Sequence, residues 1–470
     1  MTHHGGGPAE PGHIADGGDR WLLVAVAGLL SFVAMLDMNI VNVALAEIAR
    51  DLDVSAATAQ WVVLGYQLPV VALLLPAGRW LDGAGPRSAV LAATTGFAVC
   101  SALAAAAPWA GLLVTARLAQ GVFGAVLFVL MPVLVLGAVR PQMRGRAMSV
   151  PATLGPLGAV TGPAAGGMLL DGLGWRAVFL VKIPFCLLAL LVAHRTMPRD
   201  RGLRLPRTRA FLDAALVATG VSVLLVALTL AAGRSAWPAL ALGLAAVPPL
   251  WLWLRGGGGR PVTGVLRVPG LPGAHGAVLA LATGFAAMYY VIALQLQRDN
   301  GFSATATGLT VLAFPLGMVL AGPVGGRLAD RYGARPAAVA GAVVTSCGLL
   351  LAVPVDGGWS PGEVAWRLAL AGIGMGLGGG PTQALVMGAA PPDRVATVGS
   401  TVQLARSLGF TLGPALATAA WGLAGSAQGA RAGLGLAAAA ACLSVPLLLL
   451  PVRRSADATA TANAATAAPD

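Results

Sequence analysis

The stretch Gly-Arg-Trp-Leu-Asp-Gly-Ala-Gly-Pro-Arg at positions 78–87 returns as Gly-Arg-Leu-Ala-Asp-Arg-Tyr-Gly-Ala-Arg at positions 326–335. Both copies are polar and both follow long apolar runs, so each is interpreted as a short loop between two helices that cross a bilayer. Internal repeats of this kind are typical of transporters built from two parallel six-helix halves. The repeat therefore predicts an all-α polytopic membrane protein with two related halves.

The rest of the chain is dominated by apolar runs. Of its 470 residues, 57% are hydrophobic and 10% are charged, which is far from soluble usage. About fourteen runs reach membrane-spanning length: six within 21–193, two within 212–254 and six within 276–450. The expected domains are an N-terminal tail (1–20), a six-helix bundle (21–194), a basic linker with two inserted helices (195–272), a second six-helix bundle (273–451) and a disordered tail (452–470).

Alternate loops are rich in arginine, and the loops between them are poor in it. The rich loops include Arg79 with Arg87, Arg140 with Arg144 and Arg146, and Arg327 with Arg331 and Arg335. The positive-inside rule places these loops and both termini in the cytoplasm, so we expect a multi-pass protein of a bacterial cell membrane. The net charge of +12 resides in these short loops and does not indicate nucleic-acid binding.

The first apolar run contains Leu36-Asp37-Met38-Asn39-Ile40-Val41-Asn42-Val43-Ala44-Leu45. A charged side chain inside a membrane span costs roughly 2.5–3.5 kcal/mol on insertion scales and marks function by default. Asp37 is the one acidic residue well inside a predicted span, so it is the candidate proton carrier. Asn39 and Asn42 are candidates for a substrate cavity.

The repeated loop has a physical logic of its own. Glycine lets two helix ends approach closely, while Asp82 and Asp330 lie just before the next helix and can favour its positive N-terminal end. Nearby arginines can pair with these carboxylates across the interface between halves, which predicts a conformational latch; the alternative is an ordinary solvated loop. The predicted latch residues are Gly78, Asp82, Gly85, Arg87, Asp330, Arg331, Gly333 and Arg335.

Both loops resemble the cytoplasmic signature of the major facilitator superfamily. The first-helix segment is similar to the Leu-Asp-x-Thr-Ile-Val-Asn-Val-Ala-Leu-Pro motif of its fourteen-helix drug:proton antiporter branch, with Asn39 for Thr and Ala46 for Pro. Gly83 stands where the first loop usually has Arg. The resemblance spans most of the chain from Trp21 onward. It implies two six-helix bundles plus two inserted central helices, and export of drugs or antibiotics.

The fourth span carries Arg117-Leu118-Ala119-Gln120-Gly121, similar to the Arg-x-x-Gln-Gly pattern of the family. An arginine at this depth cannot reach the interface comfortably, so it should face a polar cavity or an acid. The resemblance implies a role in proton transfer beside Asp37. A structural arginine bonded to backbone carbonyls is the alternative, and Gln120 is a further cavity candidate.

The fifth span contains Gly158-Ala159-Val160-Thr161-Gly162-Pro163-Ala164-Ala165-Gly166-Gly167, similar to the antiporter signature Gly-x-x-x-Gly-Pro-x-x-Gly-Gly. Glycines four apart let helices pack backbone to backbone, and proline deletes one helical hydrogen bond. The resemblance implies an occluding hinge made by Gly158, Gly162, Pro163, Gly166 and Gly167. Generic small-residue packing is the alternative.

Further polar side chains are placed within spans. Lys182, the only lysine, stands roughly 9 Å below the Arg176 interface; it either extends outward to that interface or lines the substrate cavity. Arg406 lies near the middle of the thirteenth span, where its guanidinium needs a partner, and Gln67 is a weaker cavity candidate. Asp213 is interpreted as a carboxylate at the start of a helix.

We expect a proton-coupled antiporter that exports small hydrophobic drugs or antibiotics by alternating access. The run Gly256–Gly259 is followed by Arg260-Pro261 and lacks the features of a phosphate-binding loop, so an ion gradient must supply the energy. No enzymatic activity, cofactor or metal site is predicted. The expected partners are protons, a small hydrophobic substrate and the lipid bilayer, with no nucleic acid, and the protein is expected to be monomeric. A proton-coupled nutrient symporter of the same fold and a non-transporting membrane sensor or scaffold are the alternatives.

Overall fold

The computed structural model describes residues 19–200, 202–203, 208–232, 236–256, 259–298, 300–356, 358–425 and 428–451, and within these ranges it contains helices and no strands. The first half comprises α1 (Trp21–Asp51), α2 (Ala56–Leu81), α3 (Pro86–Ala105), α4 (Ala110–Ala138), α5 (Arg144–Leu173), α6 (Trp175–Leu180) and α7 (Ile183–Thr196). The middle segment comprises α8 (Thr208–Ala232), α9 (Ala236–Arg255) and α10 (Arg260–Leu266). The second half comprises α11 (Leu271–Arg298), α12 (Ala304–Val311), α13 (Ala313–Tyr332), α14 (Ala334–Ala352), α15 (Pro361–Gly388), α16 (Val395–Ala424) and α17 (Gly429–Leu449). Almost all of the two predicted tails lies outside the described residues.

The helix order follows the predicted spans. The pair α6 and α7 fills the sixth span and the pair α12 and α13 fills the tenth, so the described helices account for the fourteen spans and add the short α10. Nine helical segments of the described chain are long and apolar enough to cross a membrane by composition. Helices α5 and α15 are among the others because they are rich in glycine, which lowers their hydropathy and lets neighbouring helices approach closely.

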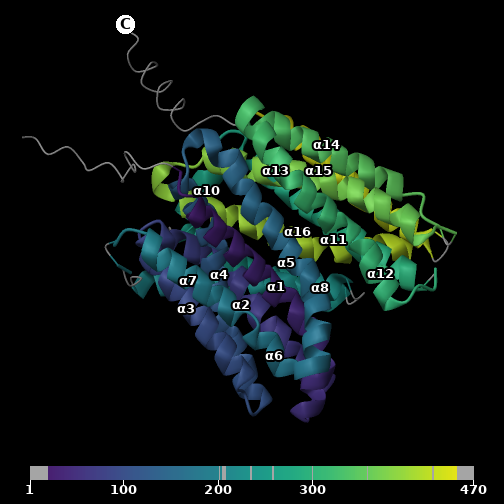
Figure 1. Ribbon diagram of the computed structural model, residues 1–470, viewed down its shortest axis with the longest axis horizontal. Coiled ribbons are helices and arrows are strands. Elements are labelled where there is room, and N and C mark those ends of the chain that lie inside the picture. Colours follow the sequence, from purple (N-terminus) through teal and green to yellow (C-terminus); the bar gives the residue numbers. More distant parts are fainter. Residues whose placement is uncertain are drawn as a thin grey trace, which may run out of the picture.

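The two halves meet at one end of the molecule and diverge toward the other, as Figure 1 shows. We call the meeting end, which carries the α2–α3, α4–α5 and α13–α14 loops, the basic end. One hydrophobic cluster at this end joins both halves and includes Leu134 of α4 and Val398 of α16. Toward the opposite end each half has a cluster of its own, with Ile40 and Phe179 in one and Phe314 in the other. The structure is therefore closed at the basic end and open at the opposite end.

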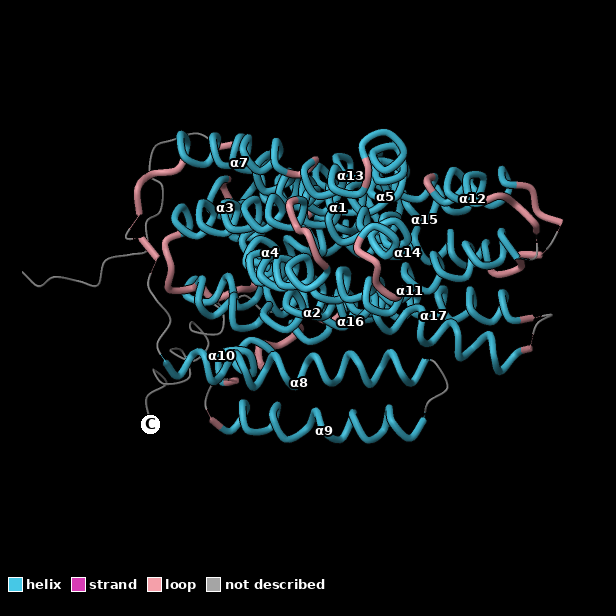
Figure 2. The backbone as a smooth tube through the Cα atoms, turned by 90° about the horizontal axis from the view of Figure 1, so that it is seen from below, coloured by secondary structure: helices cyan, strands magenta, loops and turns pink. Residues whose placement is uncertain are grey.

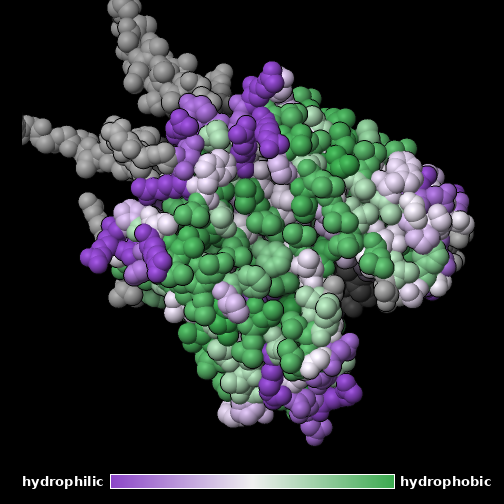
Figure 3. Space-filling model, in the orientation of Figure 1, coloured by the Kyte–Doolittle hydropathy of each residue, from purple (hydrophilic) through white to green (hydrophobic). Residues whose placement is uncertain are grey.

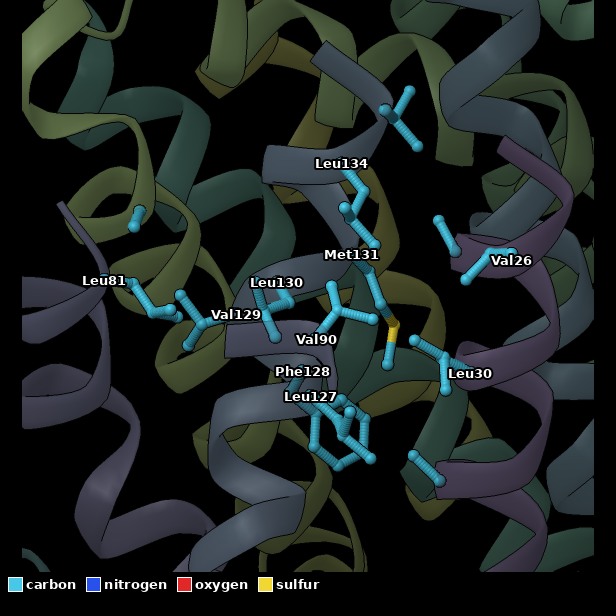
Figure 4. Close-up of a cluster of buried hydrophobic side chains, with 14 of the residues drawn as sticks. Val26, Leu30, Leu81, Val90, Leu127, Phe128, Val129, Leu130, Met131 and Leu134 are labelled. Atoms are coloured by element: carbon cyan, nitrogen blue, oxygen red, sulfur yellow. The ribbon is translucent and has the colours of Figure 1, made fainter. Parts of the chain in front are cut away.

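The core of the first half is packed around α4. Figure 4 shows Leu127 to Leu134 of α4 among Val26 and Leu30 of α1 and Val90 of α3. The side chains labelled in Figure 4 are aliphatic apart from Phe128 and Met131, which suits van der Waals packing between helices. This packing fixes the positions of α1 and α4, the two helices that carry Asp37 and Arg117.

The inserted helices α8 and α9 lie on one side of the molecule, with α9 outermost (Figure 2). Val217 and Val221 of α8 pack with Val71 of α2, and Leu404 of α16 packs against the same cluster. Arg79 on α2 pairs with Asp213 on α8 at 3.0 Å. Asp213 is thus an interhelical ion-pair partner, and α8 contacts both halves where α2 and α16 meet.

The surface matches a membrane protein. Figure 3 shows apolar residues over the middle of the molecule, polar residues gathered at its ends and a recess between the diverging halves. Trp237 near the start of α9 is 81% exposed, and Leu244 and Leu320 are also exposed. Large apolar side chains that face outward in such numbers are suited to lipid and not to water.

Candidate functional site: a buried charge cluster and two interhelical caps

A carboxylate and two cations are buried together inside the first half. Asp37 on α1, Arg117 on α4 and Lys182 between α6 and α7 are each at most 1% exposed. Arg117 Nη1 donates to Asp37 Oδ1 at 2.9 Å and to Oδ2 at 2.7 Å, and Lys182 Nζ also donates to Oδ1. We call these three residues the charge cluster. Removing an ion from water costs several kcal/mol, so the cluster depends on mutual compensation of its charges.

Arg117 is held by groups from three helices. Its Nε donates to the Val62 carbonyl of α2 at 2.9 Å, and its Nη1 donates to Gln120 Oε1 at 2.7 Å. The Tyr66 ring lies 4.5 Å from the guanidinium carbon, a cation–π contact. The two interpretations of Arg117 each describe part of this geometry, since it pairs with an acid and also bonds a backbone carbonyl.

Lys182 lies at a break in the sixth span. Val181 and Lys182 separate α6 from α7, and Pro184 occupies the first turn of α7. Proline has no N–H to donate, which favours an interruption of the helix at this point. The break presents the Lys182 side chain to Asp37 inside the bundle. Neither predicted position of Lys182 holds in this conformation, because the side chain neither extends to the interface nor lines an open cavity.

Gln120 also lies within the bundle interior and not on a cavity wall. It is fully buried, accepts from Arg117, and donates through Nε2 to Ser101 Oγ of α3 at 3.4 Å. Ser101 Oγ in turn donates to the Phe179 carbonyl of α6 at 2.9 Å. The Phe179 ring centroid is 4.9 Å from Lys182 Nζ. This hydrogen-bond chain ties α3, α4 and α6 around the charge cluster.

The other cavity candidates are less buried than the charge cluster. Asn39 is half-buried and donates to the Met35 carbonyl at 2.9 Å, whereas Asn42 is exposed. Gln67 is half-buried. Arg406 in the second half is half-buried and donates to Gln383 Oε1 at 3.1 Å. Asn39 and Asn42 lie on α1, Gln67 on α2 and Arg406 on α16, so the candidates come from both halves.

Asp330 binds the start of a helix in the opposite half. Its Oδ1 accepts from the backbone N–H of Gly145 at 2.8 Å, and its carboxylate accepts from Arg146 N, in the first turn of α5. The Arg146 side chain pairs with Oδ2 at 3.5 Å and is 45% exposed, so this ion pair adds little. The free N–H groups at a helix start bind carboxylates well.

Asp82 repeats this arrangement on the other side of the interface. It accepts from Ala396 N at 2.8 Å and Thr397 N at 3.2 Å, at the start of α16, and from the Thr397 hydroxyl. Burial raises the pKa of the Asp82 carboxyl to about 6, against the lowering effect of the hydrogen bonds from Thr397 and Ala396. The prediction that both carboxylates act on the next helix in sequence was wrong. The start of α3 is instead bound by Asp200, which accepts from Ser88 N at 3.0 Å.

The remaining predicted latch residues have separate positions. Gly78 lies against Ser400 and Ala396 of α16, where a Cβ would collide, and Gly333 has φ +96°, which favours glycine. Gly85 lies against Asp200 in its own half. Arg87 donates to the His194 carbonyl at 3.1 Å, also within its half, and Arg331 lies over the Tyr332 ring. In the described structure, Arg87, Arg331 and Arg335 form no ion pair with Asp82 or Asp330.

The glycines of the fifth span pack α5 against α1. A Cβ on Gly162 would lie 3.0 Å from Ile40 N, and one on Gly166 would lie 3.0 Å from the Ile40 carbonyl; Gly158 lies against Phe32 in the same way. Gly167 has open space beside it, and α5 runs continuously through Pro163. These glycines allow α5 to pack closely against α1, the helix that carries Asp37. The motif therefore helps to fix the position of the charge cluster.

A model of the Major Facilitator Superfamily matches residues 27–267 and 274–469 of the chain. The chain belongs to this superfamily. Its two packed halves and their repeated loops therefore belong to a major facilitator fold.

Curated relatives and a solved structure agree with this assignment. The chain is 30% identical over 430 residues to a probable actinorhodin transporter of Streptomyces coelicolor, covering 87% of this chain and 73% of that protein. It is 31% identical over 417 residues to the multidrug resistance protein Stp of Mycobacterium tuberculosis, covering 85% and 76%. The human organic anion transporter MFSD10 has a TM-score of 0.63 at 17% identity, covering 91% of this chain and 99% of that one, which shows a shared fold.

Some residues of this major facilitator site escaped the sequence analysis. Ser101 and Phe179 complete the hydrogen-bond chain. Ser101 lies in an apolar span without a charge, whereas Phe179 lies between Arg176 and Lys182, a signal that could have drawn attention to it. Tyr66 lies fully buried over Arg117. The sequence does not reveal which face of α2 meets Arg117, so this position could not be predicted.

Proposed function

We propose that this protein is a proton:substrate antiporter that exports small hydrophobic compounds across the bacterial cell membrane, with both termini in the cytoplasm. The observation that carries the proposal is the charge cluster, buried in one half of a fold whose halves are closed at one end and open at the other. A membrane protein retains such ions at depth when they serve transport, since they are costly otherwise. The relatives named as a probable actinorhodin transporter and a multidrug resistance protein support export.

The two interhelical caps support alternating access as the transport mechanism. When the basic end is closed, Asp82 binds the start of α16 and Asp330 binds the start of α5. Opening the basic end must break both sets of hydrogen bonds, so the caps hold the outward-open form until binding events elsewhere offset their stabilisation. Gain or loss of a proton changes the net charge of the charge cluster and the strength of its ion pairs. This change shifts the equilibrium between the forms that are closed and open at the basic end.

The substrate is proposed to be anionic or neutral, not a lipophilic cation. The cluster contains two cations and one anion, and Arg406 in the second half bonds the neutral Gln383. A cationic guanidinium without a carboxylate partner attracts an acidic or strongly polar oxygen of a ligand. The solved organic anion transporter of the same fold makes this class of substrate reasonable.

Purified protein in liposomes tests the proposal. An imposed proton gradient should drive substrate against its own gradient and opposite to the proton flow, and Asp37→Asn should abolish this transport while folded protein is retained. The matched control is Arg176→Gln, because Arg176 pairs with Asp51 at a half-exposed site outside the cluster. Substrate accumulation in the direction of proton flow would identify a symporter instead. Transport that ignores the proton gradient in the unaltered protein would refute proton coupling altogether.

A further inference from the structure

We infer that Lys182, and not Asp37, is the group that releases and takes up the transported proton. The inference rests on the proposed function and specifies the titrating atom within it. Asp37 then stays ionised throughout the cycle as the fixed anion that holds Arg117 and Lys182 in place. The sequence alone pointed to Asp37, because it shows an isolated acid in a span and does not reveal which cations surround it.

Charge balance favours Lys182. With all three groups ionised, the buried cluster carries one net positive charge. Protonation of Asp37 would raise the net charge to two in a region from which water is excluded, whereas deprotonation of Lys182 would lower it to zero. Buried net charge is unfavourable, and groups respond to burial by taking their neutral form. Arg117 cannot serve, because a guanidinium does not lose its proton in proteins.

The local structure favours a neutral Lys182 as well. An ammonium has three N–H donors, and in the described structure Lys182 Nζ finds one hydrogen-bond acceptor, Asp37 Oδ1. Arg117 by contrast donates to Asp37, Gln120 and Val62. Lys182 therefore has fewer hydrogen-bond acceptors than Arg117 has.

The other ionisable groups facing Lys182 do not replace it. Tyr66 of α2 is buried over Arg117, and Cys186 of α7 is buried one turn beyond Lys182. Cys100 of α3 is buried beside Ser101. Phenol and thiol groups in an apolar interior stay neutral at physiological pH, so they contribute dipoles and no charge. In the described structure α5 brings no ionisable side chain to the cluster.

The proposed step is a simple proton exchange. One N–H bond of the Lys182 ammonium breaks, its electron pair stays on nitrogen, and the proton passes to water. The resulting amine keeps an N–H donor for Asp37. Because Lys182 is fully buried in this closed-basic-end form, exchange requires a rearrangement that admits water to the cluster. Release to one side and uptake from the other side couples the rearrangement to the proton gradient.

The chain offers a direct test, because Lys182 is its only lysine. Protein made with lysine labelled with ¹³C at the ε position, and with a lysine-free tag, gives one side-chain NMR signal that reports ammonium or amine. We expect this signal to titrate over the same pH range as transport. We also expect no infrared carboxylic-acid band that disappears in Asp37→Asn. A lysine that stays charged while such an Asp37 band titrates would overturn the inference.

Two variants test the consequence for transport. Lys182→Arg keeps a permanent cation and Lys182→Met a permanent neutral group, so each should reduce proton-driven transport at least about tenfold and abolish its pH dependence. Substrate exchange at equal pH needs no net proton transfer, and we expect at least one variant to retain it within about threefold. Arg176→Gln, at the other end of α6, is the control and should behave as the unaltered protein.

The outcomes separate this inference from the proposed function. If the unaltered protein shows no proton-driven transport, the proposed function fails. If it does, and Lys182→Arg or Lys182→Met still transports with an unchanged pH profile, the antiporter stands and the assignment to Lys182 is wrong. The NMR titration needs no variant, so it decides the matter even if both variants misfold.

Discussion

In the first half, Asp37, Arg117 and Lys182 form a fully buried ionic cluster, whereas the described second half buries no carboxylate and sets Arg406 against the neutral Gln383. Both halves nevertheless carry the same loop motif, and each uses its aspartate to bind a helix start in the other half. The two halves therefore share the aspartate interactions at their interface and differ in the charged residues of their interiors. The proposed proton exchange is assigned to the first half, whereas Arg406 of the described second half has no acidic partner.

The largest expected effect comes from removing the anion of the first half. Asp37→Asn leaves Arg117 and Lys182 without compensation, so we expect loss of proton-driven efflux and a decrease of about 3–5 kcal/mol in the free energy of unfolding. Thermal unfolding in detergent and liposome transport measure the two effects. The double variant Asp37→Asn/Lys182→Met should regain part of the stability but no transport. Normal transport by Asp37→Asn would erase the functional contrast between the halves.

A smaller effect is expected from the cation of the second half. Arg406→Gln should weaken the binding of an anionic substrate about tenfold or more, because a charge-assisted hydrogen bond contributes roughly 1.5–3 kcal/mol. Binding of a neutral substrate should change little. Isothermal titration with both ligand classes measures the difference, and Arg298→Gln at the exposed end of α11 is the control. Equal loss for both ligands would contradict a charge-selective role.

The two interhelical caps should behave alike despite their different surroundings. Asp82→Ala and Asp330→Ala each remove side-chain acceptors from a helix start, which stabilise by about 1 kcal/mol, so the closed-to-open ratio at the basic end should fall about fivefold. Spin labels at Gln142→Cys and Tyr332→Cys, in a background without native cysteines, report this ratio as a distance distribution. A much larger effect of Asp330→Ala would show that the exposed Arg146 pair contributes more than expected.

The smallest expected effect is the pH dependence that Asp82 gives to closure of the basic end. In the closed form the pKa of Asp82 is raised by burial from 3.8 to about 6. Closing the basic end therefore takes up a proton between these values, so the closed form is favoured at low pH and loses this advantage as pH rises through 6. The same spin labels should report a closed-to-open ratio about twofold higher at pH 6 than at pH 7. The difference should become smaller in Asp82→Ala, in which Asp330, whose pKa burial also raises, remains. A rise in the ratio with pH would contradict the assignment.

The sequence predicted the helices well because apolar runs of membrane length leave few other structures. It missed the breaks before Ile183 and Ala313, although Pro184 and Pro315 lie close to them. Spacing from Arg176 could not show that the Lys182 side chain meets Asp37, because the sequence does not reveal which face of the sixth span lies against α1. The depth of Lys182 was predictable, and its direction was not.

The partners of the loop carboxylates illustrate a second limit. Asp82 and Asp330 were recognised as ligands for helix starts, but the next helix in sequence was the wrong one. Their true partners are 314 and 185 residues away in the chain, a separation that local pattern cannot bridge. Residue type predicted the kind of interaction, and the fold alone selected its partner.

The docking of α8 has a mechanical consequence. The halves touch along two seams, where α16 packs against α2 and α4 and where α5 packs against α13 and α15. In the described structure α8 contacts α2 and α16 of the first seam through the Arg79–Asp213 pair and the Val217 cluster. Any rocking of the halves must move α8 relative to α2 or α16. In the described structure α8 makes no comparable contact with the second seam. We therefore expect the motion to be asymmetric, because α8 restrains the two halves on one side of the molecule only.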